Sequence, residues 1–335
     1  MQMKLLRALY LLFALSTPQL KAIEIEKHCP AAMGRIAVTA DLHLGITQEA
    51  NLIKMLDRVN SRDPDVFIIA GDIGESVNLF ERALRIARTK TNVPIIVIPG
   101  NHDLWNRSLL DKRAPQKVDS KYPTSRELWE RDLPEVTQCA GCIWGEGLGF
   151  RLGDIGIAST IGWYDYSGAD PQFKGTPPRV FRDFKRKYAT DAIAIDWHWT
   201  DPEFSDVVAR PFLKTLKRFE MDPKIKSVIV ITHVPILEAQ MARNPSDKRW
   251  AMSNAYFGNL TLGSKVMTFK KVSHVVSGHS HVGRDETVMR SNGAPPIETK
   301  VIPSEYDKPV SIIIEPSHDF RPVPRGSSAF DSMPR

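Results

Sequence analysis

The stretch Pro99-Gly100-Asn101-His102-Asp103 places an amide, an imidazole and a carboxylate next to one another in the chain. The apolar run 93–98 precedes it and stops at Pro99 and Gly100. This pattern predicts a buried parallel strand that ends in a tight turn. Open α/β sheets place their chemistry at such strand ends. Asn101, His102 and Asp103 are therefore candidates for a functional site.

Polar clusters follow four further apolar runs in the same way. These clusters contain Asp41 and His43, Asp72, His233, and finally His279 and His281. The spacing of two residues within the first and last pairs lets both side chains of an extended segment point the same way. With Asn101 they make seven candidate ligands without a thiolate, a set that suits manganese, iron, zinc or nickel. Seven ligands are too many for one ion but fit two ions that share a bridging carboxylate.

The elements that must position these residues alternate along the first part of the chain. Hydrophobic runs predict strands at 36–40, 66–70 and 93–98, and helical periodicity predicts helices at 48–60 and 76–89 between them. Such an order implies a parallel sheet with right-handed crossovers. The alternation stops between 104 and about 225, where we predict a hairpin at 150–158 and helices near 181–188 and 203–220. Further strands are predicted at 228–232, 272–277, 296–303 and 309–315.

The ordered succession Asp-x-His, Gly-Asp, Gly-Asn-His-Asp, His and Gly-His-x-His resembles the motif blocks of the calcineurin-like metallophosphoesterases. The resemblance runs from about residue 35 to 315, and the segments 162–166 and 254–258 resemble those of uncharacterised bacterial members. It implies an α/β fold, namely an α/β/β/α sandwich, with an inserted elaboration between the third and fourth motif blocks. The phosphoesterase domain would then cover residues 33–316, with the insertion at about 104–225.

The resemblance also implies a role for each matched residue. One metal ion would be held by Asp41, His43 and His281, the other by Asn101, His233 and His279, and Asp72 would bridge the two. His102, paired with Asp103, would face the scissile phosphate, and Arg107 would add positive charge nearby. In such a site a metal-bridging hydroxide attacks phosphorus while His102 assists the leaving group. The expected reaction is hydrolysis of a phosphate mono- or diester by a metal-dependent phosphoric ester hydrolase.

The two ends of the chain differ in composition from the rest of its 335 residues. Lys4 and Arg7 precede an apolar run at 8–15, which resembles a secretory signal peptide and is too short to span a membrane. Residues 1–32 are thus either a signal-like segment or an extension upstream of a start at Met33. We favour a cytoplasmic enzyme, with export through the signal-like N-terminus as the alternative. The polar segment 317–335 is predicted to be a flexible tail.

Two other functions compete with this prediction. A DNA nuclease of the same superfamily shares the five blocks, but no long basic and aromatic track for nucleic acid is evident despite a net charge of +6. A non-catalytic scaffold of this fold would lack metal ligands, and this chain lacks none.

Cys139 and Cys142 form half of a zinc-binding pattern and are interpreted as incidental thiols. The expected partner is a phosphorylated small molecule or a nucleotide. No transmembrane segment is predicted in the mature domain, and no sequence feature sets an oligomeric state.

Overall fold

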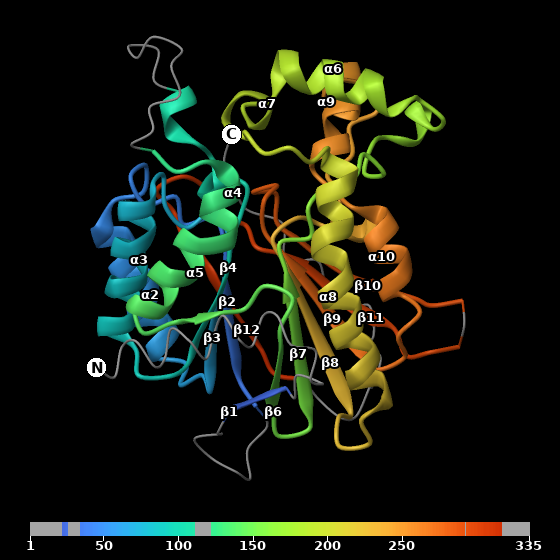
Figure 1. The fold of residues 1–335 in the computed structure, drawn as a ribbon. Coiled ribbons are helices and arrows are strands. Elements are labelled where there is room, and N and C mark those ends of the chain that lie inside the picture. Colours follow the sequence, from blue (N-terminus) through green and yellow to red (C-terminus); the bar gives the residue numbers. More distant parts are fainter. Residues whose placement is uncertain (1–21, 26–33, 111–121, 292, 317–335) are drawn as a thin grey trace, which may run out of the picture.

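The structure is a computed structural model that describes residues 22–25, 34–110, 122–291 and 293–316 (Figure 1). The predicted tail and nearly all of the signal-like segment lie outside these residues. Within the described ranges, no helix combines the length and the apolar character needed to cross a bilayer.

Two β-sheets form the centre of the molecule (Figure 1). The first has five strands, in the order β12 (Ser311–Ile314), β2 (Ile36–Thr39), β3 (Val66–Ala70), β4 (Ile95–Ile98) and β5 (Ile143–Trp144). The second has seven strands, in the order β1 (Ile23–Ile25), β6 (Gly149–Leu152), β7 (Ile155–Thr160), β8 (Ser227–Thr232), β9 (Val272–Ser277), β11 (Ile297–Val301) and β10 (Arg284–Val288). Strands β2, β3 and β4 are parallel, as are β7, β8 and β9.

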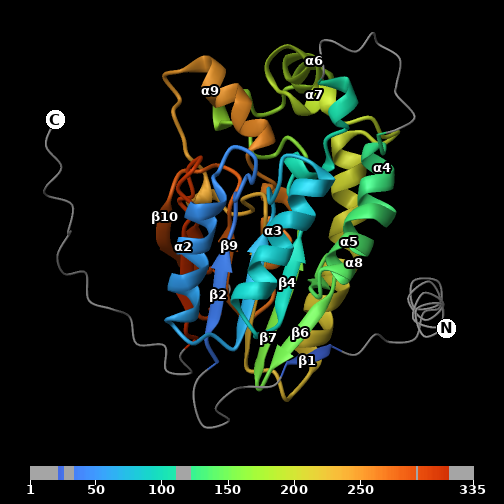
Figure 2. The ribbon, with the colours of Figure 1, turned by 90° about the vertical axis from the view of Figure 1, so that its left-hand side faces the viewer.

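Helices cover the outer face of each sheet. The five-stranded sheet is covered by α2 (Glu49–Asn60), α3 (Val77–Lys90) and α5 (Leu133–Cys139), and the seven-stranded sheet by α8 (Asp201–Met221) and α10 (Leu260–Val266). Short helices α4 (Ser125–Glu127), α6 (Pro178–Tyr188), α7 (Asp191–Ala194) and α9 (Lys248–Ser253) complete the fold. Figure 2 shows α6, α7 and α9 above one end of the strands. We call these three helices the cap.

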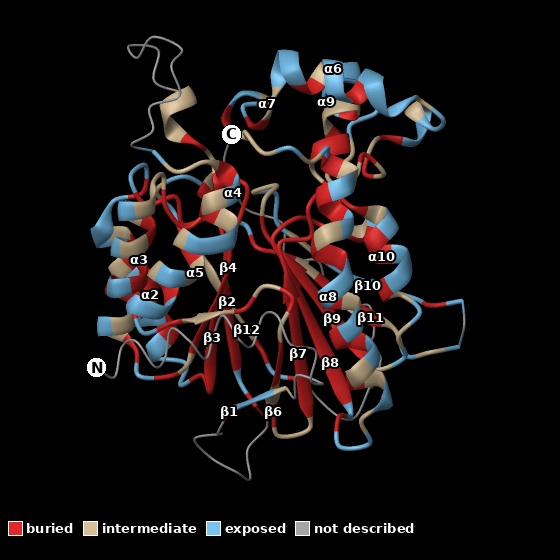
Figure 3. Cartoon of the chain, viewed as in Figure 1, coloured by how far each residue is buried: buried red, intermediate tan, exposed pale blue. Residues whose placement is uncertain are grey.

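Successive side chains along each strand point to opposite faces of its sheet, and this alternation produces the layers of the fold. In β2, Ile36 and Val38 pack between the two sheets with residues such as Ile229 and Ile231 of β8. Ala37 faces the other way, toward the helices of its own sheet. Because both faces are covered, every residue of β2, β3, β4 and β8 is buried, whereas the outward faces of the helices are exposed (Figure 3). The predicted α/β/β/α sandwich is confirmed.

The stretch predicted as an insertion supplies part of this core. The predicted hairpin is confirmed as β6 and β7, joined antiparallel, but β7 also pairs in parallel with β8 and thereby enters the seven-stranded sheet. Strand β5 extends the other sheet, and α8 covers β7. Residues 23–25, which lie within the predicted N-terminal extension, form β1. This strand pairs with β6 and buries Ile25 in the core.

Candidate metal centre

The seven predicted ligands meet where the parallel strands end. Asp41 and His43 follow β2, Asp72 follows β3, Asn101 follows β4, His233 follows β8, and His279 and His281 follow β9. Their acidic and imidazole side chains form two clusters in which the possible ligand atoms all lie within 4.8 Å of one another: Asp41 with His43 and His281, and Asp72 with His233 and His279. The division is the one that the motif resemblance implied.

The carboxylate of Asp72 lies between the two clusters. Its Oδ1 is 3.4 Å from Nε2 of His233, and its Oδ2 is 3.7 Å from Nε2 of His43. Both distances are too long for good hydrogen bonds. The side chain is 2% exposed, so water does not solvate it. One buried carboxylate therefore faces both clusters with a different oxygen, as a bridging ligand would.

The hydrogen bonds around the site leave electron lone pairs directed inward. Nδ1–H of His233 donates to the carbonyl of Ala70, and Nε2–H of His279 donates to that of Tyr256. Their other ring nitrogens therefore carry lone pairs, and both lie about 3 Å from Oδ1 of Asn101 (3.1 and 3.0 Å), which is also an acceptor. Three acceptors facing one another repel unless a proton or a metal ion lies among them. This donor set fits a metal ion.

The charges of the site act in the same direction. Burial alone would lower the pKa of His233, but the carboxylates of Asp72 and Asp41 raise that pKa to about 9. Burial, reinforced by the charge of His233, lowers the pKa of His279 to about 4, which keeps its imidazole in the neutral form that binds metals. The buried carboxylates thus favour a positive charge at the point where the imidazole lone pairs converge.

Backbone conformation differs from the extended geometry predicted for the two paired motifs. Asp41 and His43 have φ of 57° and 43°, and His279 and His281 have φ of 67° and 57°. The strands have already ended at these positions, so the side chains converge through left-handed turns and not through strand alternation. Asp72 adopts the same region, with φ of 51°. Such conformations cost roughly 1–3 kcal/mol each for residues other than glycine and cluster at functional sites.

Two glycines permit the close packing of these turns. A Cβ atom on Gly100 would lie 2.1 Å from Oδ1 of Asp72, and one on Gly278 would lie 2.4 Å from Oδ2 of Asp41. Each glycine therefore lets the backbone of one motif approach a carboxylate of another. This requirement explains the glycine that precedes Asn101 and the one that precedes His279.

His102 lies beside the two clusters and lines the cavity above them. Its ring stacks on that of Trp105, with centroids 3.7 Å apart, and its Nε2 is 4.0 Å from Oδ2 of Asp72. Burial opposes protonation, yet the charges of Asp72 and Glu75 raise the pKa of His102 above its ordinary value. Its nitrogen also falls within 4.8 Å of ligand atoms of His43 and Asp72. Contact with the substrate and metal ligation are both within its reach.

The predicted pairing of Asp103 with His102 is wrong. Both oxygens of Asp103 face inward and accept backbone N–H groups, from Ile73 and Gly74 on Oδ1 and from Gly100 on Oδ2. The pairing fails because residues 102–104 form a 3₁₀ turn, in which successive side chains point in different directions. Asp103 joins the turn after β3 to the turn after β4 and does not touch the imidazole.

Sequence comparison places these motifs in a family. A sequence model of calcineurin-like phosphoesterases matches residues 34–283, which is most of the chain. The chain belongs to the calcineurin-like phosphoesterase family. The match spans all five motif blocks, so the predicted superfamily is confirmed.

Proteins similar to this phosphoesterase include two of known structure. The crystal structure of phosphopantetheinyl hydrolase from Mycobacterium tuberculosis shares the fold, with a TM-score of 0.57 at 18% identity over 84% of this chain and 96% of that one. A dimetal phosphatase from Danio rerio aligns with a TM-score of 0.41 at 12% identity, over 81% and 87% of the two chains. Among relatives matched by sequence, a component of the nuclease SbcCD from Staphylococcus saprophyticus is 31% identical over 89 residues, 22% of this chain. That match spans about a quarter of the relative, 24% of its length.

Glu75 takes the place beside His102 that the sequence suggested for Asp103. Its Oε1 accepts a hydrogen bond from Nδ1 of His43 at 2.8 Å and lies 3.3 Å from Nδ1 of His102, in ion-pair range but off line for a hydrogen bond. Its Oε2 accepts from Arg107 at 2.6 Å. Burial would raise the pKa of Glu75, but these neighbours hold it well below the usual range. Sequence reasoning missed Glu75, although it lies three residues after Asp72.

Asp191 links the cap to the phosphoesterase site and was also missed. Its Oδ1 accepts from Nδ2 of Asn101 at 2.9 Å and from the indole N–H of Trp105 at 2.6 Å. Its Oδ2 accepts from the hydroxyl of Tyr164 at 2.8 Å. Burial favours the neutral acid, yet the charge of Lys185 and these hydrogen bonds hold the pKa of Asp191 below its ordinary value. This carboxylate fixes which end of the Asn101 amide faces the imidazoles.

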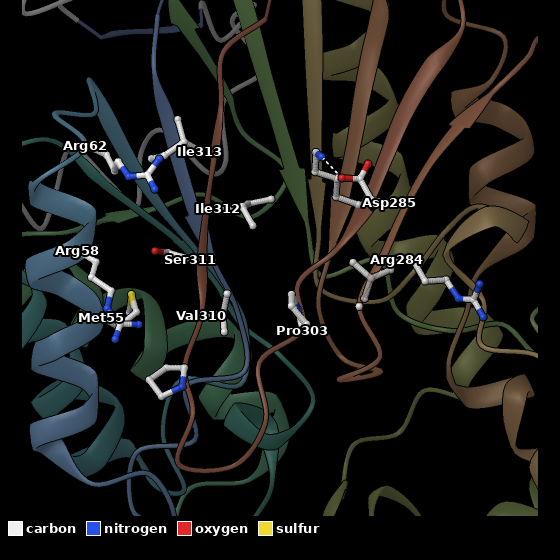
Figure 4. Close-up of a pocket in the computed structure, with 14 residues that line it drawn as sticks. Met55, Arg58, Arg62, Arg284, Asp285, Pro303, Val310, Ser311, Ile312 and Ile313 are labelled. Carbon is white, nitrogen blue, oxygen red and sulfur yellow. Dashed lines mark hydrogen bonds and ion pairs between the residues drawn. The ribbon is translucent and has the colours of Figure 1, made fainter. Parts of the chain in front are cut away.

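A cavity of about 1060 Å³ opens over the candidate metal centre. Asp72, Asn101, His102, His279 and His281 form its floor, and residues of the cap form a wall. A second groove, of about 800 Å³, lies between α2 and the edge strands β12 and β10 (Figure 4). None of the seven predicted ligands lines this groove.

Proposed function

We propose that this phosphoesterase hydrolyses a phosphate mono- or diester with two divalent metal ions bound at the ends of the strands. The observation that carries the proposal is the position of Asp72, whose two buried oxygens face two separate clusters. Two ions need one shared ligand of this kind, whereas a single ion needs only one of the clusters. Manganese, iron, zinc and nickel all suit the nitrogen and oxygen donors present.

The residues divide between the two ions as follows. Asp41, His43 and His281 would hold one ion, Asn101, His233 and His279 the other, and Asp72 both. When bound, such ions lower the pKa of water and neutralise the charge on phosphoryl oxygens. Glu75 and Asp191 support this set, because they orient His43 and Asn101 from behind.

His102 supplies a proton to the departing oxygen of the ester. Its imidazole is at the cavity, its pKa is raised by Asp72 and Glu75, and Trp105 holds the ring in place by stacking. A positioned acid of this kind typically contributes 10²- to 10⁴-fold to a rate. Glu75, rather than Asp103, lies on the far side of the ring and stabilises the protonated form.

The nuclease alternative has less support. It rests on the partial match to a component of SbcCD. The exposed basic residues of α6 do not line the cavity; these are Arg179, Arg182, Arg186 and Lys187. A scaffold without activity is disfavoured because none of the seven predicted ligands is replaced.

A substrate panel on the purified full-length protein tests the proposal. We expect manganese-loaded protein to hydrolyse at least one monoester, diester or cyclic ester, and EDTA to abolish the reaction. Asp72→Asn, which keeps the shape but removes the charge, should be inactive on the same substrates. Preferential cleavage of DNA would favour the nuclease, and absence of hydrolysis despite bound metal would favour the scaffold.

A further inference from the structure

Aromatic rings extend from the candidate metal centre along the cap wall of the cavity. The ring of Phe257 is 5.2 Å from that of His279, and the ring of Trp250 in α9 is 6.4 Å from that of Phe257. The last two rings are nearly parallel, with 9° between their planes. Both residues line the same cavity as the metal ligands. Two ring-to-ring steps therefore lead from a ligand of the proposed metal ion to the outer part of the cavity.

Trp250 is partly exposed and held in a fixed position. It is 41% exposed, and it lines the cavity. Its indole N–H donates to the carbonyl of Ala242 at 2.7 Å, and its backbone N–H is capped by Asp247 at the start of α9. Exposure thus does not come from a loosely held side chain. A rigid aromatic face that is presented to a cavity suits a planar ligand.

Polar groups surround this face. Arg249 places its guanidinium 4.7 Å from the centre of the Tyr188 ring, and Asp247, Arg249 and Ser253 line the cavity beside Trp250. A heteroaromatic ring has hydrogen-bonding atoms at its edge that can pair with such groups, whereas an aliphatic chain has none. Tyr188 is itself 40% exposed and offers a second ring at the same wall.

We propose that the substrate is a nucleotide, whose base stacks on Trp250 while its phosphate lies over the strand ends. The inference rests on the proposed function, since it names the substrate class of that site. The ribose would lie beside Phe257, between the ring of Trp250 and the ends of the strands. A cavity of about 1060 Å³ that joins the ligands to the aromatic wall accommodates the three parts of such a molecule.

The test measures binding and is independent of turnover. The probes are the methylene phosphonates of adenosine and of methyl riboside, in which CH₂ replaces the ester oxygen so that neither is hydrolysed. Calorimetry on the purified full-length protein should show the adenosine compound binding about 5- to 150-fold more tightly, the range of one base stacked on an aromatic ring. Trp250→Ala should reduce this ratio to near one, and Tyr122→Ala, which removes an exposed ring outside the cavity, should leave it unchanged.

Two results would overturn the inference. Equal affinity of the wild-type protein for the two probes would show that the base is not recognised. A preference that survives Trp250→Ala would show that the base lies elsewhere. Either result leaves the proposed function standing if the substrate panel still shows metal-dependent hydrolysis, so the two failures are distinguishable.

Discussion

His102 differs from the other imidazoles of the site in the surroundings of its ring. The rings of His233 and His279 each donate to a backbone carbonyl, which directs a lone pair inward. His102 instead stacks on Trp105 and is 17% exposed at the cavity. A fixed imidazole that directs a lone pair inward suits metal ligation, whereas an imidazole that a substrate in the cavity can reach suits proton transfer.

The variant His102→Ala separates these two roles. We expect it to retain its metal ions and to lose about 10²- to 10⁴-fold in turnover of an alkyl phosphate. The loss should be smaller for a nitrophenyl phosphate, because that leaving group departs without a proton. The comparison needs turnover on both substrates and elemental analysis, with His198→Ala as a control because His198 does not line the cavity. Loss of metal in step with activity would make His102 a ligand, and equal slowing on both substrates would exclude it as the proton donor.

Among the elements, the short helix α7 connects the cap to the ends of the strands. It begins with Asp191, which holds the amide of Asn101 and the indole of Trp105 with one oxygen. Through these two contacts α7 binds one proposed metal ligand, Asn101, and the indole on which His102 stacks. We therefore regard α7 as a positioning element, since Asp191 is not proposed to contact the substrate or a metal ion.

The variant Asp191→Asn tests this positioning role. An amide offers one acceptor where the carboxylate offers two, so Asn101 loses its fixed orientation or Tyr164 loses its partner. We predict a tenfold to hundredfold weaker affinity for one of the two metal ions, as for other residues that orient ligands from behind. Titration with manganese should show it, and Asp183→Asn, an exposed acid on α6, should titrate like the wild type. Unchanged affinity for both ions would remove Asp191 from the positioning network.

Local sequence patterns predict the strands and helices of this fold better than they predict the residues that orient the side chains of its candidate site. Hydrophobic periodicity indicates β2, α2, β3, α3 and β4 because each element buries one face or both. Asp191 could not be predicted in the same way, since 90 positions separate it from Asn101 and only tertiary packing joins them. Glu75 precedes a helix, where acids are common for other reasons. Adjacency in sequence was misleading for Asp103, which points away from its neighbour.

For the molecule as a whole, Glu146 lies where the two sheets join. It follows β5 of one sheet and lies 2.6 Å from both the hydroxyl of Thr160 and the N–H of Ile161, at the end of β7 in the other. Burial raises the pKa of this carboxyl from 4.5 to about 8. The folded state therefore keeps a proton that the unfolded chain releases above about pH 4.5. With respect to this group, stability is greatest at low pH and falls as pH rises from 4.5 to about 8.

Glu146→Gln should remove that part of the pH dependence. The amide oxygen can accept from the N–H of Ile161, the amide NH₂ can donate to the hydroxyl oxygen of Thr160, and the side chain has no proton to lose. We expect the variant to gain stability over the wild type between about pH 5 and 8, on the order of a few kcal/mol at the upper end. Urea unfolding across this range measures the effect, with Glu130→Gln as an exposed control. Parallel pH profiles for wild type and variant would contradict a neutral Glu146.

The stoichiometry of bound metal tests the central claim most directly. Active, full-length protein should contain close to two transition-metal ions per chain, because Asp41, His43 and His281 face one oxygen of Asp72 and the second cluster faces the other. Elemental analysis should be made on preparations whose activity is measured in parallel, together with Asp72→Asn, in which both ions should be lost or weakly held. A consistent content of one ion, or of none, in active protein would contradict the dinuclear account.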